Sequence, residues 1–246
     1  MSLQAASAAE RGAGSLVRQA MQAVTAHIRV HALRVGDTLP GEGHFAAELG
    51  VSRAVMREAF GALAALNLID VANGRRPRVA ALDGSVMATS LDHALSTAQV
   101  SVPQIWDVRR ALELRTAFLA AQNRTQAEAV RLIEIAEAMA RDADHLSIMT
   151  NHDIAFHQTV ARASRNELFN HIVSSFGPMM EIAVPTAWRT RVAIDRRRIM
   201  LDRHQDVARA IAATDPEAAQ AAMEAHFDAS IGDILASSSF GASDMS

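Results

Sequence analysis

Apolar residues recur every three to four positions over most of the chain, which predicts a protein built mainly of helices. In the N-terminal third this period starts at Ser15, stops near Gly36 and returns in a short stretch over residues 42–49. A third helix is expected from Ser52, whose side chain is a favourable N-cap. These segments predict a small helical domain at the N-terminal end.

Two short extended runs follow this domain's third helix. They cover residues 68–71 and 78–80, and the Asn73-Gly74 pair lies between them. Asn-Gly is a strong signal for a tight hairpin turn. Three helices followed by a hairpin are the layout of a winged helix-turn-helix, in which the third helix enters the major groove of DNA and the hairpin touches the backbone or minor groove.

Beyond residue 84 the apolar residues recur only at helical spacing, which predicts a series of helices, and Pro178 is expected to bend one of these helices. The stripes run from Ile105 to Leu119, Leu132 to Met139, Met149 to Val160, Leu168 to Ala187, Leu201 to Ile211 and Met223 to Ile234. The predicted fold is therefore mostly α, with an N-terminal winged helix-turn-helix followed by an antiparallel all-α bundle. We expect flexible ends at 1–14 and 237–246, a DNA-binding domain at 15–80 and a helical domain at 85–236.

Composition narrows the possible chemistry. The chain has 246 residues, no cysteine and no lysine, so all 24 of its basic residues are arginine. Thiol nucleophiles, cysteine-ligated metals, Walker-A lysines and Schiff-base lysines are excluded. No apolar run has the length needed to span a membrane, and the N-terminus lacks the pattern of a signal peptide, so a cytoplasmic protein without membrane contact is expected.

Charge is distributed unevenly along the chain. Residues 1–80 carry a formal charge of +3 and residues 81–246 a charge of −6, although the whole chain has a net charge of only −3. A basic N-terminal segment is typical of a domain that binds a polyanion.

Arg53 and Arg57 strengthen the prediction of DNA binding, because their i, i+4 spacing places both on one face at the start of the third helix. Arginine paired with guanine is the commonest specific base contact, and Ser52 can hydrogen-bond a phosphate while it caps the helix. Arg75 adds positive charge to the wing.

Four polar residues interrupt the apolar stripes of the second domain. Asp153 and His157 are i, i+4 neighbours on one helix, and His204 and His226 lie on the inner faces of two later helices. Burying such groups without partners is costly, and one divalent metal would satisfy all four. Three histidines and an aspartate suit Zn²⁺ first, with Ni²⁺, Co²⁺, Mn²⁺ or Fe²⁺ as further possibilities. The alternative is that each histidine is an ordinary core residue bonded to a neighbour.

The N-terminal motifs resemble a known family. Residues 36–59 contain the runs Leu-Gly-Val-Ser-Arg at 49–53 and Val-Met-Arg-Glu-Ala at 55–59, which are similar to the N-terminal domain of GntR-superfamily transcription regulators. The resemblance implies that Ser52, Arg53 and Arg57 contact operator DNA and that Gly74 of the wing lies against the groove. One difference is Gly43, where relatives often carry an arginine that reaches DNA.

The second half resembles the FCD ligand-binding domain of FadR-type GntR regulators. The similar elements are Val108 to Glu113, Asn151 to His157, Arg203 to Ile211 and Ala222 to His226. All four metal-ligand positions of the metal-binding branch are filled, by Asp153, His157, His204 and His226. The resemblance implies a homodimer that binds operator DNA and a small carboxylate effector that completes the metal's coordination shell.

Arg109 matches a family position that faces the effector pocket, where a guanidinium can hold a carboxylate with two hydrogen bonds. Its alternative role is an i, i+4 salt bridge to Glu113. The function predicted overall is a regulator, not an enzyme, most simply a repressor that a small organic acid releases from DNA. Two alternatives stay open: a metal-dependent hydrolase or lyase with a helical core, and a regulator whose metal is purely structural.

Overall fold

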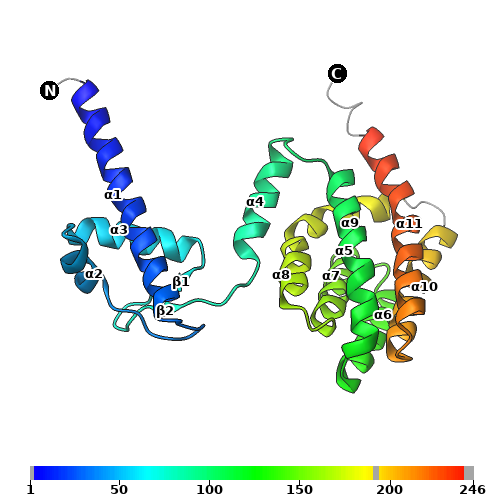
Figure 1. The fold of residues 1–246 in the computed structure, drawn as a ribbon. Helices are drawn as coiled ribbons and strands as arrows, with labels where there is room; N and C mark the ends of the chain where they lie inside the picture. The colour runs from blue at the N-terminus through cyan, green and yellow to red at the C-terminus, as the bar shows by residue number, and fades with distance from the viewer. Residues whose placement is uncertain (1–2, 191–193, 241–246) are drawn as a thin grey trace. The chain divides into compact units, whose positions relative to one another are not determined.

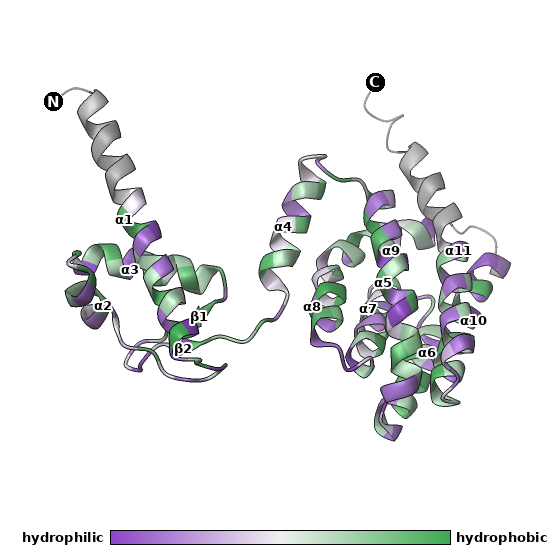
Figure 2. Ribbon diagram, in the orientation of Figure 1, coloured by the Kyte–Doolittle hydropathy of each residue, from purple (hydrophilic) through white to green (hydrophobic). Residues whose placement is uncertain are grey.

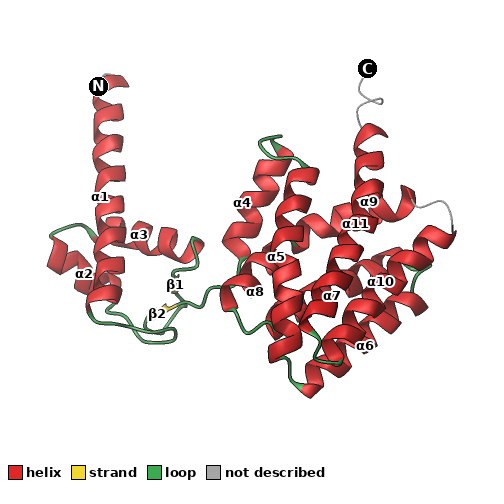
Figure 3. Cartoon of the chain, turned by 45° about the vertical axis from the view of Figure 1, so that its right-hand side comes forward, coloured by secondary structure: helices red, strands yellow, loops and turns green. Residues whose placement is uncertain are grey.

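The computed structural model describes residues 3–190 and 194–240, which form two compact units divided between residues 86 and 87 (Figure 1). Helices dominate both units, and one two-stranded sheet is the sole sheet within the described residues (Figure 3). The mostly α fold with a small N-terminal hairpin, predicted from the sequence, is thus confirmed. The parts of the expected flexible ends at 1–2 and 241–246 lie outside the described residues.

The first unit contains three helices and the hairpin. The helices are α1 (Leu3–Val30), α2 (Glu42–Leu49) and α3 (Arg53–Ala65), and the strands are β1 (Ile69–Asp70) and β2 (Arg78–Val79). Its core is one apolar cluster from all of these elements, centred on Val24, Phe45, Met56, Phe60 and Leu63, each at most 1% exposed. Gly50 ends α2 in the left-handed conformation, with φ 65°, which turns the chain sharply into α3.

The hairpin is antiparallel, with Ile69 opposite Val79 and Asp70 opposite Arg78. Gly74 lies in the connecting loop with φ 77°, a conformation in which a side chain would be strained. The position of the turn confirms the hairpin predicted from Asn73-Gly74.

The second unit is a helical bundle whose helices bury their apolar faces in a single core and turn hydrophilic faces outward (Figure 2). Its helices are α4 (Ser85–Ser96), α5 (Val102–Asn123), α6 (Gln126–Arg141), α7 (Leu146–Ala163), α8 (Glu167–Ser175), α9 (Gly177–Thr190), α10 (Ile194–Ala212) and α11 (Pro216–Phe240), with α4 beginning just before the division. Capping boxes start two of them, at Ser101 with Gln104 and at Thr125 with Glu128. Helices α5, α7, α10 and α11 pack on one another and carry the site described below.

Three features differ from the sequence-based expectation. Helix α1 begins at Leu3 rather than Ser15, because residues 3–14 are rich in alanine, the strongest helix former. Helix α4 was not predicted, since it contributes only partly buried residues to the core. The single helix expected from Leu168 to Ala187 is two helices, because Pro178 cannot donate a backbone hydrogen bond and instead lies in the first turn of α9.

Candidate functional site

Helix α7 places Asp153 and His157 on its buried face, one turn apart. Their residues are 7% and 4% exposed, in the same stripe as the fully buried Phe156 and Val160. A stripe of apolar residues therefore carries two polar side chains into the bundle core. This agrees with the face predicted from the 3.6-residue period.

Helices α10 and α11 each bring one further imidazole to this position. His204 is 1% exposed and His226 is 3% exposed. The ring centroids lie 4.4 Å apart for His204 and His226, 5.1 Å for His157 and His226, and 5.7 Å for His157 and His204. One potential ligand atom from each of the three lies within 4.8 Å of those of the other two. Three of the four predicted ligands thus converge, and Asp153 reaches the group through His204, with Oδ1 3.1 Å from Nε2.

Two of the imidazoles have their outer nitrogen engaged. His204 Nδ1 donates to the Met200 carbonyl oxygen at 2.9 Å, and His157 Nδ1 donates to Glu113 Oε2. Neither acceptor can donate in return, so each Nδ1 carries the hydrogen and Nε2 of the neutral ring presents a lone pair. This is the arrangement that metal-ligating histidines use, with one nitrogen oriented by an outer acceptor and the other left for the ion.

The contact between Asp153 and His204 tests whether a cation fits here. Burial raises the pKa of Asp153, but its contact with His204 and the nearby His157, His204 and Arg109 side chains outweigh burial and lower the pKa to about 2. The carboxylate is therefore ionised, and in a neutral His204 its oxygen faces a nitrogen lone pair. His204 Nε2 has no hydrogen-bond partner among the described residues. A metal ion between the two acceptors would relieve this contact, and so the residues present fit a divalent metal.

A small cavity adjoins the three histidines. It has a volume of about 20 Å³, which is room for roughly one water molecule. Its lining comes from six helices: Trp106, Met139, Met149, Asp153, His157, Ala183, Val184, Ala187, Trp188, Met200, His204, His226 and Ser230. Four of these residues belong to α9, so this helix forms one wall of the cavity.

Glu113 was not predicted as part of the site, yet it links two of the predicted residues. It is fully buried on α5 and contacts His157 through Oε2 and Arg109 Nε through Oε1, the latter at 2.8 Å. Burial raises the pKa of this carboxyl, but the Arg109 guanidinium and His157 outweigh burial and keep it below its usual value. Glu113 therefore orients His157 as an ionised acceptor.

Arg109 occupies the second of the two roles foreseen for it. Its guanidinium is buried in the salt bridge to Glu113 and lies over the rings of Trp106 and Phe227, with Cζ 4.8 and 5.6 Å from their centroids. The cavity lining does not include it in the described structure. Contact with an effector stays a prediction for this residue.

Replacing Glu113 with glutamine is expected to lower Zn²⁺ affinity roughly 10- to 100-fold, the usual effect of removing a partner that orients a metal-ligating histidine. The neutral amide offers one acceptor oxygen, which cannot serve both Arg109 and His157 as the carboxylate does. Isothermal titration calorimetry with Zn²⁺ measures the change.

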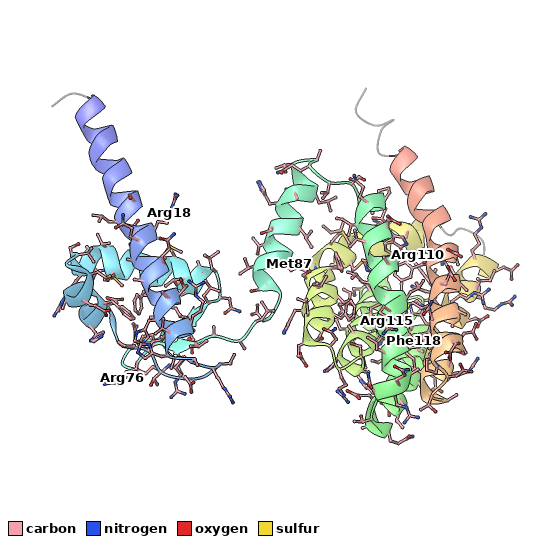
Figure 4. All side chains as sticks on the ribbon, viewed as in Figure 1. Arg18, Arg76, Met87, Arg110, Arg115 and Phe118 are labelled. Atoms are coloured by element: carbon pink, nitrogen blue, oxygen red, sulfur yellow. The ribbon has the colours of Figure 1, made fainter. Side chains whose placement is uncertain are left out.

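The matched control is Glu224→Gln on α11. Glu224 also pairs with an arginine of α5, Arg110, at 2.6 Å, but this pair is partly exposed and does not contact the histidines. Figure 4 labels Arg110 on α5. Equal Zn²⁺ affinities for the two variants would contradict the orienting role of Glu113.

The predicted DNA-reading residues lie together at the start of α3. Ser52 caps this helix, with its side chain accepting from Val55 N at 3.2 Å. Arg53 and Arg57 are exposed one turn apart. Gly43 lies beside Arg53: a Cβ atom built on Gly43 would be 3.9 Å from Arg53 Nη2. The exposed helix start therefore offers two cations, a hydroxyl and the positive end of the helix dipole.

The wing carries the remaining predicted DNA contacts. Gly74 is exposed, and Arg75 pairs with Asp70 across the hairpin at 3.0 Å. Arg76, also exposed, lies beside Arg75 in the same loop (Figure 4). Because both partners are exposed, this pair is weak, and Arg75 can exchange Asp70 for a DNA phosphate.

Two family models match the chain. The model "Bacterial regulatory proteins, gntR family" matches residues 16–79, and the model "FCD domain" matches residues 104–229. Together the two matched ranges contain both the exposed arginines of α3 and the buried histidines.

Characterised proteins with similar sequences are transcription regulators. The chain is 29% identical to the HTH-type transcriptional regulator LutR of Bacillus subtilis over 79% of this chain and 90% of LutR. It is 30% identical to the Glc operon transcriptional activator of Escherichia coli over 79% of each chain. The transcriptional repressor NanR of Citrobacter rodentium is 25% identical over 78% of this chain and 75% of NanR.

Among solved structures, the fold is similar to that of Streptococcus agalactiae GntR. The TM-score is 0.62 at 24% identity, over 87% of this chain and 97% of that one. A membrane-spanning role has no support from the described helices, since none of them is long and apolar enough to cross a bilayer.

Proposed function

The chain belongs to the gntR family of bacterial regulatory proteins and carries an FCD domain, and from this premise we propose that it is a metal-containing transcription regulator that responds to a small organic acid. Its role as a DNA-binding regulator follows from the family. The hydrolase or lyase alternative is not retained, because the matched domains and relatives are regulators rather than enzymes. The metal and the acid are the new parts of the proposal.

The convergence of three buried imidazoles supports the metal. One ligand atom from each of His157, His204 and His226 lies within 4.8 Å of the others, and Asp153 faces His204 Nε2 at 3.1 Å. When bound, a divalent metal supplies a Lewis-acid centre that takes a carboxylate as a further ligand. The protein's part is to hold the imidazoles oriented, through Glu113 and the Met200 carbonyl, in a pocket lined by apolar side chains.

The size of the cavity constrains how an acid binds. About 20 Å³ holds a water molecule but no organic acid. Effector binding therefore requires the cavity to widen, so the bound and unbound pockets differ in shape. A ligand that prefers one shape shifts the population toward it, which is the requirement for a signal.

We propose that two chains form a homodimer whose two N-terminal units, here called the heads, bind a pseudo-palindromic operator. Ser52, Arg53 and Arg57 of each head contact base edges and phosphates. Gly74 and Arg75 contact DNA from the wing. The acid acts on DNA affinity only if it favours one arrangement of the heads. Relatives are named both as activator and as repressor, and release of DNA on acid binding is the direction proposed for this chain.

Thermal denaturation tests the proposal. Protein loaded with Zn²⁺, and the same protein after chelation, is screened against small organic acids. We expect chelation to lower the melting temperature, and one acid to raise the melting temperature only in the loaded form. At a hundred times its Kd, that acid would add about 2.7 kcal/mol to the free energy of unfolding. If chelation destabilises the protein but no acid stabilises it, the metal has only a structural role and the effector part of the proposal fails.

A further inference from the structure

Trp106 lines the cavity and has a buried polar atom that a metal cannot satisfy. The residue is 5% exposed, lines the cavity beside the three histidines, and its indole Nε1 is buried without a hydrogen-bond partner among the described residues. An indole N–H is a donor only, so it cannot ligate a metal. Leaving a buried donor unsatisfied is costly, and such groups in native proteins call for an explanation.

The ring of Trp106 is held in place by its neighbours. Phe227 packs against it edge-on, with centroids 5.5 Å apart, and the Arg109 guanidinium lies over its face. Arg109 is itself fixed by Glu113. The indole is thus oriented by a packed, charged network, while its N–H has no acceptor from the protein.

We propose that Trp106 Nε1–H donates a hydrogen bond to an oxygen of the acid bound at the metal centre, and so helps to determine which acids bind. This inference rests on the proposed function. A metal held by the three histidines would take one carboxylate oxygen, which would leave a second oxygen for the indole N–H. A ligand that places a methyl or an N–H at that position leaves the indole unsatisfied and binds more weakly.

Trp106 is better placed for this contact than Arg109. Both residues are on α5, three positions apart, but Trp106 lines the cavity and Arg109 does not. Arg109 Nε is already engaged by Glu113 at 2.8 Å. Arg109 therefore supports the ring, whereas Trp106 lines the cavity and has an unsatisfied donor.

The test compares the chain with its Trp106→Phe variant, in which an aromatic ring stays and the N–H is lost. Zn²⁺ affinity, measured by calorimetry, is expected to be the same for both. Acetate, a small carboxylate with a second oxygen, then titrates the Zn²⁺-loaded proteins. Its affinity is expected to fall roughly 10- to 100-fold in the variant, the effect of losing a hydrogen bond to a charged group.

A second readout follows the indole directly. The chain has two tryptophans, so ¹⁵N-indole spectra contain two signals, and the variant identifies the signal of Trp106. Acetate is expected to move the Trp106 N–H proton downfield in the Zn²⁺-loaded protein and to leave it unchanged after chelation.

Three outcomes would overturn the assignment. If acetate binds both loaded proteins equally and the indole signal does not move, the donor role fails while the proposed function stands. If Trp106→Phe loses Zn²⁺, the tryptophan only shapes the metal centre. If acetate has no effect on loaded wild-type protein, the metal-linked effector site fails and the role of Trp106 fails with it.

Discussion

The His204→Ala variant is expected to lose nearly all Zn²⁺ binding. His204 is the most buried of the three imidazoles, its Nδ1 is fixed by the Met200 carbonyl, and its Nε2 faces Asp153. Alanine removes a ligand itself, so the loss should exceed the roughly 10- to 100-fold effect of removing an outer partner. Metal content after desalting and competition with a chromogenic chelator measure it.

His152→Ala is the matched control for this prediction. His152 is also a histidine of the bundle and lies next to Asp153 in sequence, but it pairs with Asp142 at 3.0 Å and is not among the three convergent imidazoles. The control variant should retain full metal. If His204→Ala also retains full metal, His204 is a core histidine and the proposed metal centre is wrong.

The Arg53→Ala variant is expected to bind its operator more weakly by about 1–3 kcal/mol and to tolerate more bases at one position of each half-site, because a bidentate arginine–guanine contact carries that much discrimination. Arg53 is exposed at the N-terminal end of α3, where a recognition helix meets base edges. The operator is first obtained by selection from random DNA. Gel-shift titrations on the selected site and its single-base variants then give both quantities.

Arg18→Ala controls for the loss of one positive charge. Arg18 is exposed on α1, an arginine of the same unit that the sequence does not place on the recognition helix or wing (Figure 4). It should leave base preference unchanged, although affinity falls slightly with total charge. An unchanged footprint and base preference for Arg53→Ala would remove Arg53 from the DNA interface.

Local signals explain why the first unit could be predicted in detail. The cap at Ser52 and the Asn73-Gly74 turn each act within a few residues, and the structure has both of them where the sequence places them. Helical period also predicted that Asp153, His157, His204 and His226 face inward, and all four are buried.

The partners of those buried residues could not be read from the sequence. Glu113 and Arg109 look like an ordinary i, i+4 surface pair, and only the packing of α5 against α7 turns them into a buried link to His157. Likewise, the unsatisfied N–H of Trp106 depends on what surrounds it in space. Periodicity tells which face a residue occupies, whereas hydrogen bonds between helices depend on helix register and crossing angle.

The same limit applies to helix ends in the bundle. Pro178 was expected to bend a helix and instead follows a break, since a proline is equally acceptable in the first turn of a new helix. Choosing between a kink and a break requires knowing how residues on both sides pack. Figure 1 shows α8 and α9 as separate helices.

The placement of the two tryptophans has an optical consequence. Both line the cavity beside the three histidines and the chain contains no tyrosine, so its tryptophan fluorescence originates entirely in this one pocket. The DNA-binding unit contains no tryptophan and adds nothing to this signal. A change in emission on adding operator DNA would therefore report that DNA affects the pocket. By reciprocity, the factor by which DNA changes the affinity for the acid equals the factor by which the acid changes the affinity for DNA.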